Sequence, residues 1–108
     1  MSLSVVKKQR LVKWVNALRS GKFKKGIGKL KQGKNSFTYC CLGVAREIFP
    51  DNIKKERNEE LLNKTSCRFL GIDNRDQMDL ADMNDNSFPR KTFRGIANYI
   101  EERFIYER

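Results

Sequence analysis

Thiols, carboxylates and amines are the groups in this sequence that can do chemistry, because the chain contains no histidine. Its three cysteines have no Cys-x-x-Cys spacing and no evident fourth ligand, so they do not predict a zinc site. Without an imidazole, the chain lacks the commonest general base and the usual partner of a nucleophilic cysteine. We therefore expect no catalytic residue, no metal site and no cofactor, and we interpret the protein as a non-enzyme.

The cysteines themselves favour a structural role. Cys40 and Cys41 are adjacent, and neighbours in sequence rarely bridge each other, so we expect buried, reduced thiols there. The odd cysteine count favours a reducing compartment. The alternative is that one of the pair is a thiolate with a depressed pKa at the start of a helix.

Aspartates recur at every third residue from Asp73 to Asp85. On a helix this spacing forms a slowly drifting acidic stripe, which by default is a solvated face. We expect the stripe to lie against the basic first half of the chain and to help orient the two lobes.

Part of this stripe can be compared with a calcium-binding loop. Asp82, Asn84 and Asn86 match the first three oxygen ligands of that loop. Ser87 replaces its required glycine, however, and Phe93 replaces its terminal glutamate. The calcium pattern therefore fails, while a magnesium site with fewer protein ligands stays open as an alternative.

Charge is distributed very unevenly. The first 46 residues contain twelve Lys or Arg and no Asp or Glu, whereas the rest of the chain carries eleven basic and thirteen acidic residues. This asymmetry predicts contact with an anion, which could be a nucleotide, a nucleic acid or an acidic host protein; the alternative is a merely solvated surface. We assign ligand binding to six basic residues of this half: Arg19, Lys24, Lys25, Lys29, Lys31 and Lys34.

Most of these basic residues fall in a glycine-rich stretch, residues 21–36. We expect a β-hairpin there, with Leu30 facing inward and with Gly26 or Gly28 at the turn or in a bulge. Its backbone N–H groups and lysines can surround a phosphate. It is not a Walker A loop, because Ile27 and Gly28 occupy the positions that need Lys and Ser or Thr.

The most apolar stretch is residues 37–49. Its first three residues suit a short strand, and the remainder suits a core helix that Pro50 ends. The positions at helical spacing are Leu42, Ala45 or Arg46, and Phe49.

Further helices flank this centre. Residues 2–20 carry an apolar stripe that includes Trp14, and Gly21 is placed to end the helix in a left-handed conformation. Residues 58–70 suit a short helix, and Thr92 suits the N-cap of a C-terminal one. The 108 residues thus predict an α+β fold, a single small domain spanning residues 1–108 with about four helices and a short basic β-hairpin.

No run of about 18 apolar residues and no secretory signal pattern is present. We expect a cytoplasmic protein that does not contact a membrane. No sequence feature indicates the oligomeric state.

Several segments together resemble small bacteriophage-encoded proteins. These proteins share the patterns W-x-x-A-L-R-S-G-x-Y/F, F-C-C-L-G-V, and L-N-D followed by F-x-x-I-A-x-x-I-E. The segments of this chain that resemble them are residues 14–23, 28–30, 37–44, 80–85 and 92–101. It departs from them at Met83, where leucine is usual, and in its lysine-rich hairpin. The resemblance implies a phage accessory protein that acts in the host cell, and it implies no family-wide activity.

Two function classes follow. The first is a non-enzymatic binder that sequesters a small anionic host ligand, such as a nucleotide signal of antiviral defence. The alternative is a module that binds nucleic acid or a host protein through the basic N-terminal half. We favour the first class, because Trp14, Phe23 and Phe37 are all expected in the core and so leave no aromatic platform for single-stranded nucleic acid.

Overall fold

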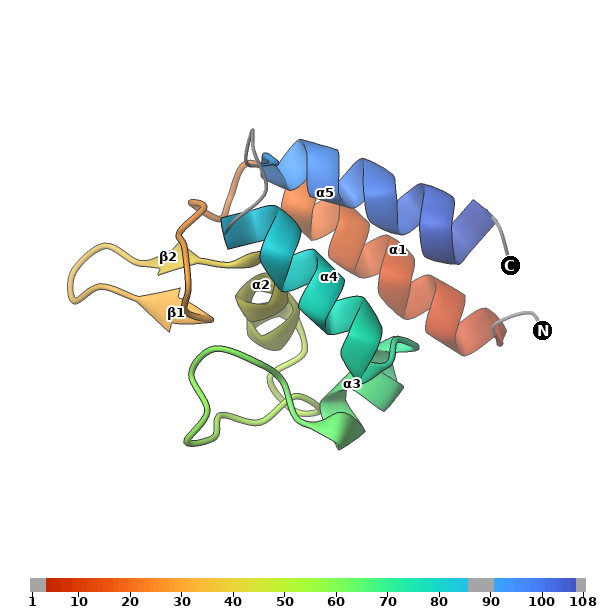
Figure 1. Ribbon diagram of the computed structural model, residues 1–108, viewed down its shortest axis with the longest axis horizontal. Helices are drawn as coiled ribbons and strands as arrows, with labels where there is room; N and C mark the ends of the chain where they lie inside the picture. The colour runs from red at the N-terminus through yellow and green to blue at the C-terminus, as the bar shows by residue number, and fades with distance from the viewer. Residues whose placement is uncertain (1–3, 86–90, 107–108) are drawn as a thin grey trace.

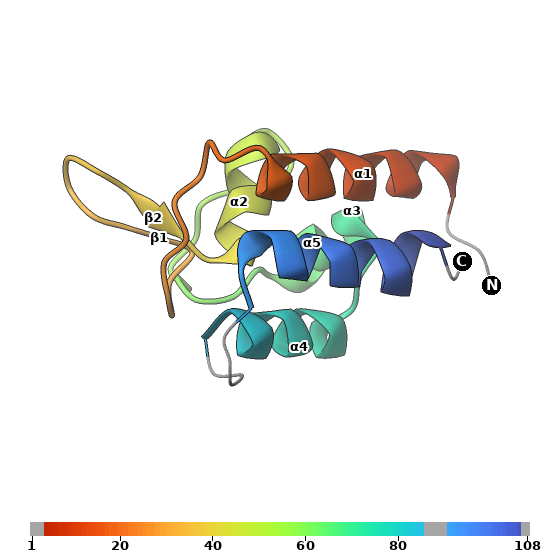
Figure 2. The same cartoon turned by 90° about the horizontal axis from the view of Figure 1, so that it is seen from above.

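Three helices run side by side around the core of the computed structural model, which describes residues 4–85 and 91–106. They are α1 (Val5–Arg19), α4 (Asn74–Asp85) and α5 (Phe93–Ile100), and Figure 2 shows α1 and α4 on opposite sides of α5. A π-helical segment, η1 (Glu101–Tyr106), continues α5 alongside α1.

The first helix follows its sequence pattern. The hydroxyl of Ser4 accepts a hydrogen bond from the backbone N–H of Lys7 and caps the start of α1. Gly21, with a φ of 78°, adopts the predicted left-handed conformation just beyond its end. The apolar stripe is buried, Trp14 included, and the indole N–H of Trp14 donates to the carbonyl oxygen of Cys41 across 2.9 Å. The predicted core position of Trp14 is confirmed.

A short strand leads into a buried helix at the centre of the molecule, as predicted. Strand β2 (Thr38–Tyr39) is followed by α2 (Cys41–Ile48), which ends at Phe49, directly before Pro50. Figure 1 shows α2 behind α4, between the hairpin and α1. Residues 41–46 of this helix are all buried, so its packing positions the elements on either side of it.

A two-stranded hairpin is present, but it lies partly beyond residues 21–36, where it was expected. Strand β1 (Lys31–Gln32) pairs with β2 in antiparallel fashion, so the turn runs through Gly33, with a φ of 119°, and not through Gly26 or Gly28. The reason is that β2 already has a second neighbour, since the backbone of residues 24–26 exchanges hydrogen bonds with Tyr39. Leu30 is buried as predicted.

Two phenylalanines near the hairpin differ in their exposure. Phe23 packs edge-on against Tyr39, with ring centroids 5.3 Å apart. Phe37 was expected in the core, but it is 41% exposed. The expectation was wrong because the turn through Gly33 places Phe37 on the projecting end of the hairpin, ahead of the buried part of β2.

The helix expected over residues 58–70 begins later than predicted, as α3 (Lys64–Leu70). Tertiary contacts hold the preceding residues out of the helix. The carbonyl oxygen of Glu59 accepts from the N–H of Leu30, and both backbone polar groups of Leu62 bond to the buried side-chain amide of Gln77. Asn63 then caps α3 by accepting from the N–H of Ser66.

Each of the last two α-helices begins directly after its capping residue. Asp73 accepts a hydrogen bond from the N–H of Asp76 and caps α4, and Thr92 accepts from Gly95 and caps α5. The apolar stripe of the C-terminal segment, from Phe93 to Phe104, is buried. Five α-helices and one two-stranded hairpin among the described residues confirm the α+β class, with one helix more than the four or so expected. None of the described helices combines the length and apolar character needed to cross a bilayer.

One buried amide connects the end of α4 to the start of α2. Cys40, the N-cap of α2, makes no side-chain capping bond. The Asn84 side chain supplies it instead, since its Oδ1 accepts from the N–H of Cys41 while its Nδ2 donates to the carbonyl oxygen of Gly26. The carboxylate of Asp85 accepts from the N–H of Gly28. The C-terminal end of the acidic stripe therefore lies against the basic first half, as expected.

Gly43 is required by a close approach of two backbones. A Cβ atom at this position of α2 would overlap the carbonyl oxygen of Leu30. The chain ahead of β1 therefore lies directly on α2, which explains the glycine in the Cys-Cys-Leu-Gly-Val segment.

We predict that Gly43→Ala lowers the free energy of unfolding by about 1–3 kcal/mol, because the backbone at Leu30 must move to admit the methyl group. Gly95→Ala is the matched control. A Cβ there meets nothing closer than 3.5 Å, so the helix preference of alanine should raise stability by up to about 1 kcal/mol. Urea denaturation followed by circular dichroism measures both. Equal stability of the two variants would contradict the close approach.

Candidate functional site

The six basic residues predicted to bind ligand do not gather at one place. Arg19 is held on the helical side of the molecule, where its two terminal nitrogens donate to both carboxylate oxygens of Glu101, at 3.1 and 3.0 Å. This hydrogen-bonded ion pair raises the pKa of Arg19 and lowers the pKa of Glu101. Arg19 also donates to Asn98 and thus serves to join α1 to the C-terminal segment.

The predicted lysines also differ from one another in what they contact. Lys25 donates to the backbone carbonyl oxygen of Asn84 at 2.8 Å and so fastens the basic loop to the end of α4. Lys24 and Lys29 are exposed on this loop, and Lys34 is exposed in the hairpin turn. Lys31 differs from these, because it lies beside a hollow at the base of the hairpin.

Arg46 faces the same hollow from α2, and the sequence prediction did not include it. Its side chain is buried, with 7% of the residue exposed, and its Nη1 nitrogen has no hydrogen-bond partner among the described residues. A guanidinium stays charged at any pH that a protein tolerates. Leaving such a group buried without a partner is costly, so the described residues leave a requirement for a hydrogen-bond acceptor at this nitrogen.

Two hollows meet at Arg46. One, of about 190 Å³, is also lined by Glu47, Pro50 and Ile53, and the other, of about 230 Å³, by Gln32, Gly33, Phe37 and Glu59. Both are lined by Lys31, Arg46 and Lys55. We call the two hollows together the arginine pocket.

Three elements hold the cations of the arginine pocket. Lys31 comes from β1 and Arg46 from α2, while Lys55 comes from the loop of residues 50–63 that connects α2 to α3. This loop lies across from the hairpin in Figure 1. It is anchored at Ile53, whose N–H donates to the carbonyl oxygen of Phe49, and at Glu59 and Leu62 through the bonds described above.

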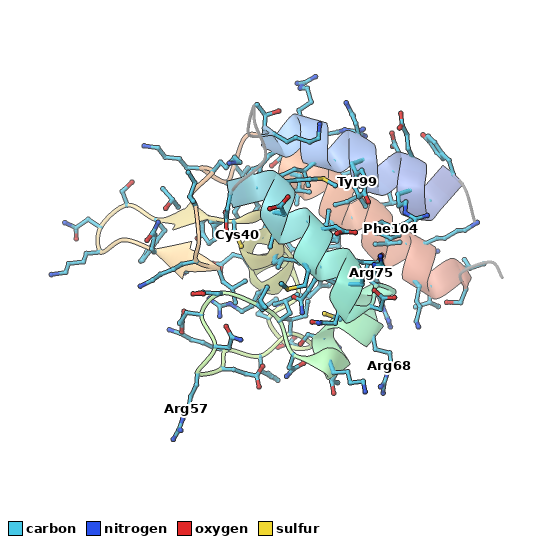
Figure 3. The ribbon with its side chains drawn as sticks, in the orientation of Figure 1. Cys40, Arg57, Arg68, Arg75, Tyr99 and Phe104 are labelled. Carbon is cyan, nitrogen blue, oxygen red and sulfur yellow. The ribbon has the colours of Figure 1, made fainter. Side chains whose placement is uncertain are left out.

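The anchored loop still presents side chains to solvent. Figure 3 shows Arg57 pointing away from the body of the molecule, so it does not belong to the pocket. The backbone anchors at Ile53 and Glu59 lie on either side of Lys55 in the sequence and hold that stretch beside α2.

The charges of the pocket favour an anion. Its three cations face two carboxylates, those of Glu47 and Glu59, so the lining keeps a positive balance. The Lys31 ammonium lies 3.4 Å from the Glu47 carboxylate in a partly exposed ion pair that water screens. Lys31 can therefore exchange Glu47 for another anion at little cost, whereas Nη1 of Arg46 has no bond to give up.

A larger hollow, of about 490 Å³, lies where α3 meets α4 and is lined in part by Lys64, Cys67 and Arg68. Burial raises the pKa of Cys67 to about 11, so its thiol is protonated at neutral pH. No unpartnered buried polar atom is found at this hollow within the described part of the chain. The arginine pocket is therefore the stronger candidate, although it is the smaller one.

The remaining sequence-based alternatives weaken in the structure. Burial raises the pKa of Cys40 and raises that of Cys41 further, which contradicts the interpretation of either as a reactive thiolate. Figure 3 shows Cys40 at the junction of the hairpin and α2. Across residues 4–85 and 91–106, no three His, Cys, Asp or Glu side chains converge as metal ligands would.

The calcium comparison can be judged at two of its positions. Asp82 and Asn84 belong to helix α4, whereas a calcium loop is not helical there. Asn86 and Ser87 lie outside the described residues.

Sequence reasoning missed Arg46 because the residue stands inside the most apolar segment of the chain. One signal was available, since Arg46 shares a helical face with Leu42 and Phe49. An arginine on an apolar face must be partnered within the fold or by something from outside. No local pattern indicated that Lys31 and Lys55 would meet it, because these residues come together through long-range contacts.

A family model described as Domain of unknown function (DUF8296) matches residues 6–68. The matched segment includes Lys31, Arg46 and Lys55. No curated protein and no solved structure matches the chain.

We predict that Arg46→Met raises the free energy of unfolding in anion-free buffer by about 1–3 kcal/mol, because it replaces a buried, incompletely bonded charge with an apolar side chain of similar length. Arg19→Met is the matched control and should lower stability, since it breaks the paired contact to Glu101. Urea denaturation of both variants tests this. A less stable Arg46→Met variant would show that the fold itself satisfies Arg46.

Proposed function

The chain belongs to the DUF8296 family, a domain of unknown function, and we propose that it is a non-enzymatic binder of a small phosphate-bearing anion, held in the arginine pocket. The observation that carries this proposal is the unpartnered Nη1 nitrogen of buried Arg46. An anion that reached this nitrogen would satisfy a group that the described residues leave unbonded.

The composition of the pocket supports phosphate as the bound group. A guanidinium presents a planar set of donors that fits phosphate oxygens, and the ammonium groups of Lys31 and Lys55 add point charges on either side. A phosphate monoester carries a charge of about −1.5 to −2 at neutral pH. It would offset the positive balance of the lining and can draw Lys31 away from Glu47.

A binding role without catalysis fits the same lining. The described side chains around the two hollows include no thiol and no hydroxyl group that could act as a nucleophile. The chain as a whole contains no imidazole. These features support retention of an anion in preference to its conversion.

The resemblance to small phage-encoded proteins extends the proposal to biology. We propose a phage accessory protein, acting in counter-defence, that sequesters an anionic signal in the cytoplasm of the host cell. A pocket that holds a phosphate group is sufficient for sequestration, since that role needs affinity and no turnover.

We predict that sodium phosphate raises the unfolding temperature of the protein more than sodium chloride at equal ionic strength, because a ligand that binds only the folded state stabilises it. Arg46→Met should reduce the difference to the general stabilising effect that phosphate has on folded proteins. Lys31→Gln/Lys55→Gln should weaken phosphate binding about tenfold to hundredfold, as measured by isothermal titration calorimetry, because charged hydrogen bonds are lost.

Lys24→Gln/Lys29→Gln removes the same charge outside the pocket and is the matched control, which should leave phosphate affinity nearly unchanged. Glu59→Gln should tighten binding, because it removes a like charge from the lining. A phosphate affinity, measured by calorimetry, that survives in Arg46→Met, or that the control pair weakens as strongly as the pocket pair, would refute the proposed site.

The alternative function, binding of nucleic acid or an acidic host protein, rests on the exposed positions of Lys24, Lys29 and Lys34. Binding to a polynucleotide backbone would show log affinity falling with log salt at a slope of about −0.7 to −0.9 for each phosphate neutralised. It would also depend on the control pair of lysines more than on Arg46. That combined result would favour the alternative.

A further inference from the structure

Phe37 is an exposed aromatic ring next to the arginine pocket. It is 41% exposed and lines the larger of the two hollows together with Gln32 and Gly33. Burying an aromatic ring is among the largest apolar gains available to a small protein. Phe37 thus places a ring that is open to solvent beside a cation-lined hollow, where a flat group of a bound molecule could cover it.

Lys31 links this ring to the cations. Its ammonium lies 4.3 Å from the centre of the Phe37 ring and 5.7 Å from that of Tyr39. The ring attracts the cation, so Phe37 helps to hold Lys31 in the lining of the arginine pocket. A phosphate bound by Lys31 would thus lie within the length of one nucleotide from the exposed ring.

Resting on the proposed function, we propose that the ligand is a nucleoside phosphate, whose phosphate binds at Lys31, Arg46 and Lys55 and whose base stacks on Phe37. Every base has a flat π-face that an aromatic side chain can accept. The pocket then recognises two chemical features at once, a charged group at its centre and a flat ring at its hairpin end.

The arrangement fits one nucleotide and not a strand of nucleic acid. A platform for single strands needs several aromatic side chains in a row beside a basic groove. Among the described residues, the exposed large aromatic side chains are Phe37 and Tyr106. Tyr106 ends η1, which lies at the opposite end of the molecule from the hairpin in Figure 2. Phe37 therefore offers a stacking surface for a single base.

The test compares three probes on the full chain by isothermal titration calorimetry. They are ribose 5-phosphate, which has the phosphate without a base, adenosine, which has the base without a phosphate, and adenosine 5′-monophosphate, which has both. We expect the monophosphate to bind about fivefold to hundredfold more tightly than ribose 5-phosphate, which is the range that one stacked base supplies. Adenosine should bind most weakly.

Phe37→Leu should remove the advantage of adenosine 5′-monophosphate over ribose 5-phosphate. This ratio isolates the stacked base, because loss of the contact between Phe37 and Lys31 changes the affinity for both phosphate probes alike. Tyr106→Leu is the matched control and should keep the advantage, because η1, which ends at Tyr106, lies at the opposite end of the molecule from the hairpin. Both substitutions are at exposed positions, so the circular-dichroism spectrum should stay that of the folded protein.

The outcomes separate this inference from the function on which it rests. Equal binding of ribose 5-phosphate and adenosine 5′-monophosphate would overturn the stacked base and leave the phosphate site standing. An advantage that persists in Phe37→Leu would place the base elsewhere and would also overturn the inference. If neither phosphate-bearing probe binds, both the inference and the proposed function fail.

Discussion

The side-chain amide of Asn84 is the contact on which the arrangement of the site depends. It caps α2 from outside that helix, through Cys41, and it holds the basic loop through Gly26. The backbone carbonyl oxygen of the same residue accepts a hydrogen bond from the ammonium of Lys25. Because a buried N–H without a partner is costly, these bonds fix where α2 begins relative to the loop. The start of α2 in turn determines which side of the helix Arg46 occupies and what it faces.

The arginine pocket opposes stability. The fold buries a permanent charge at Arg46 and leaves one of its nitrogens without a bond, while an apolar side chain there would pack without that penalty. This loss of stability is confined to the surroundings of Arg46, because the apolar side chains of α2 pack into the core. Proteins tolerate such unfavourable groups where function requires them. The ion pair between Lys31 and Glu47 is partly exposed and therefore adds little stability, so Lys31 can exchange Glu47 for another anion at little cost.

Net charge alone did not distinguish the basic residues that hold the fold together from those that line the arginine pocket. Of the basic residues in the acid-free first half, Arg19 and Lys25 serve the fold, the first by joining α1 to Glu101 and the second by fastening the loop to α4. The pocket instead combines one lysine from that half with Arg46 at its very end and Lys55 beyond it. A count of charges along the chain cannot distinguish a basic residue that bonds to another part of the protein from one that lines a pocket, because both roles use the same side chains.

The sequence by itself determined the features that depend on neighbours within one or two helical turns. The stripe of α1 with Trp14, the left-handed end at Gly21 and the cap at Thr92 are of this kind, since capping and helix periodicity are local. Tertiary structure alone decided the register of the hairpin, the late start of α3 and the exposure of Phe37. These depend on hydrogen bonds between residues far apart in sequence, such as those from Gln77 to Leu62. Local preference cannot specify such pairings, because each backbone group takes the partner that the assembled core brings to it.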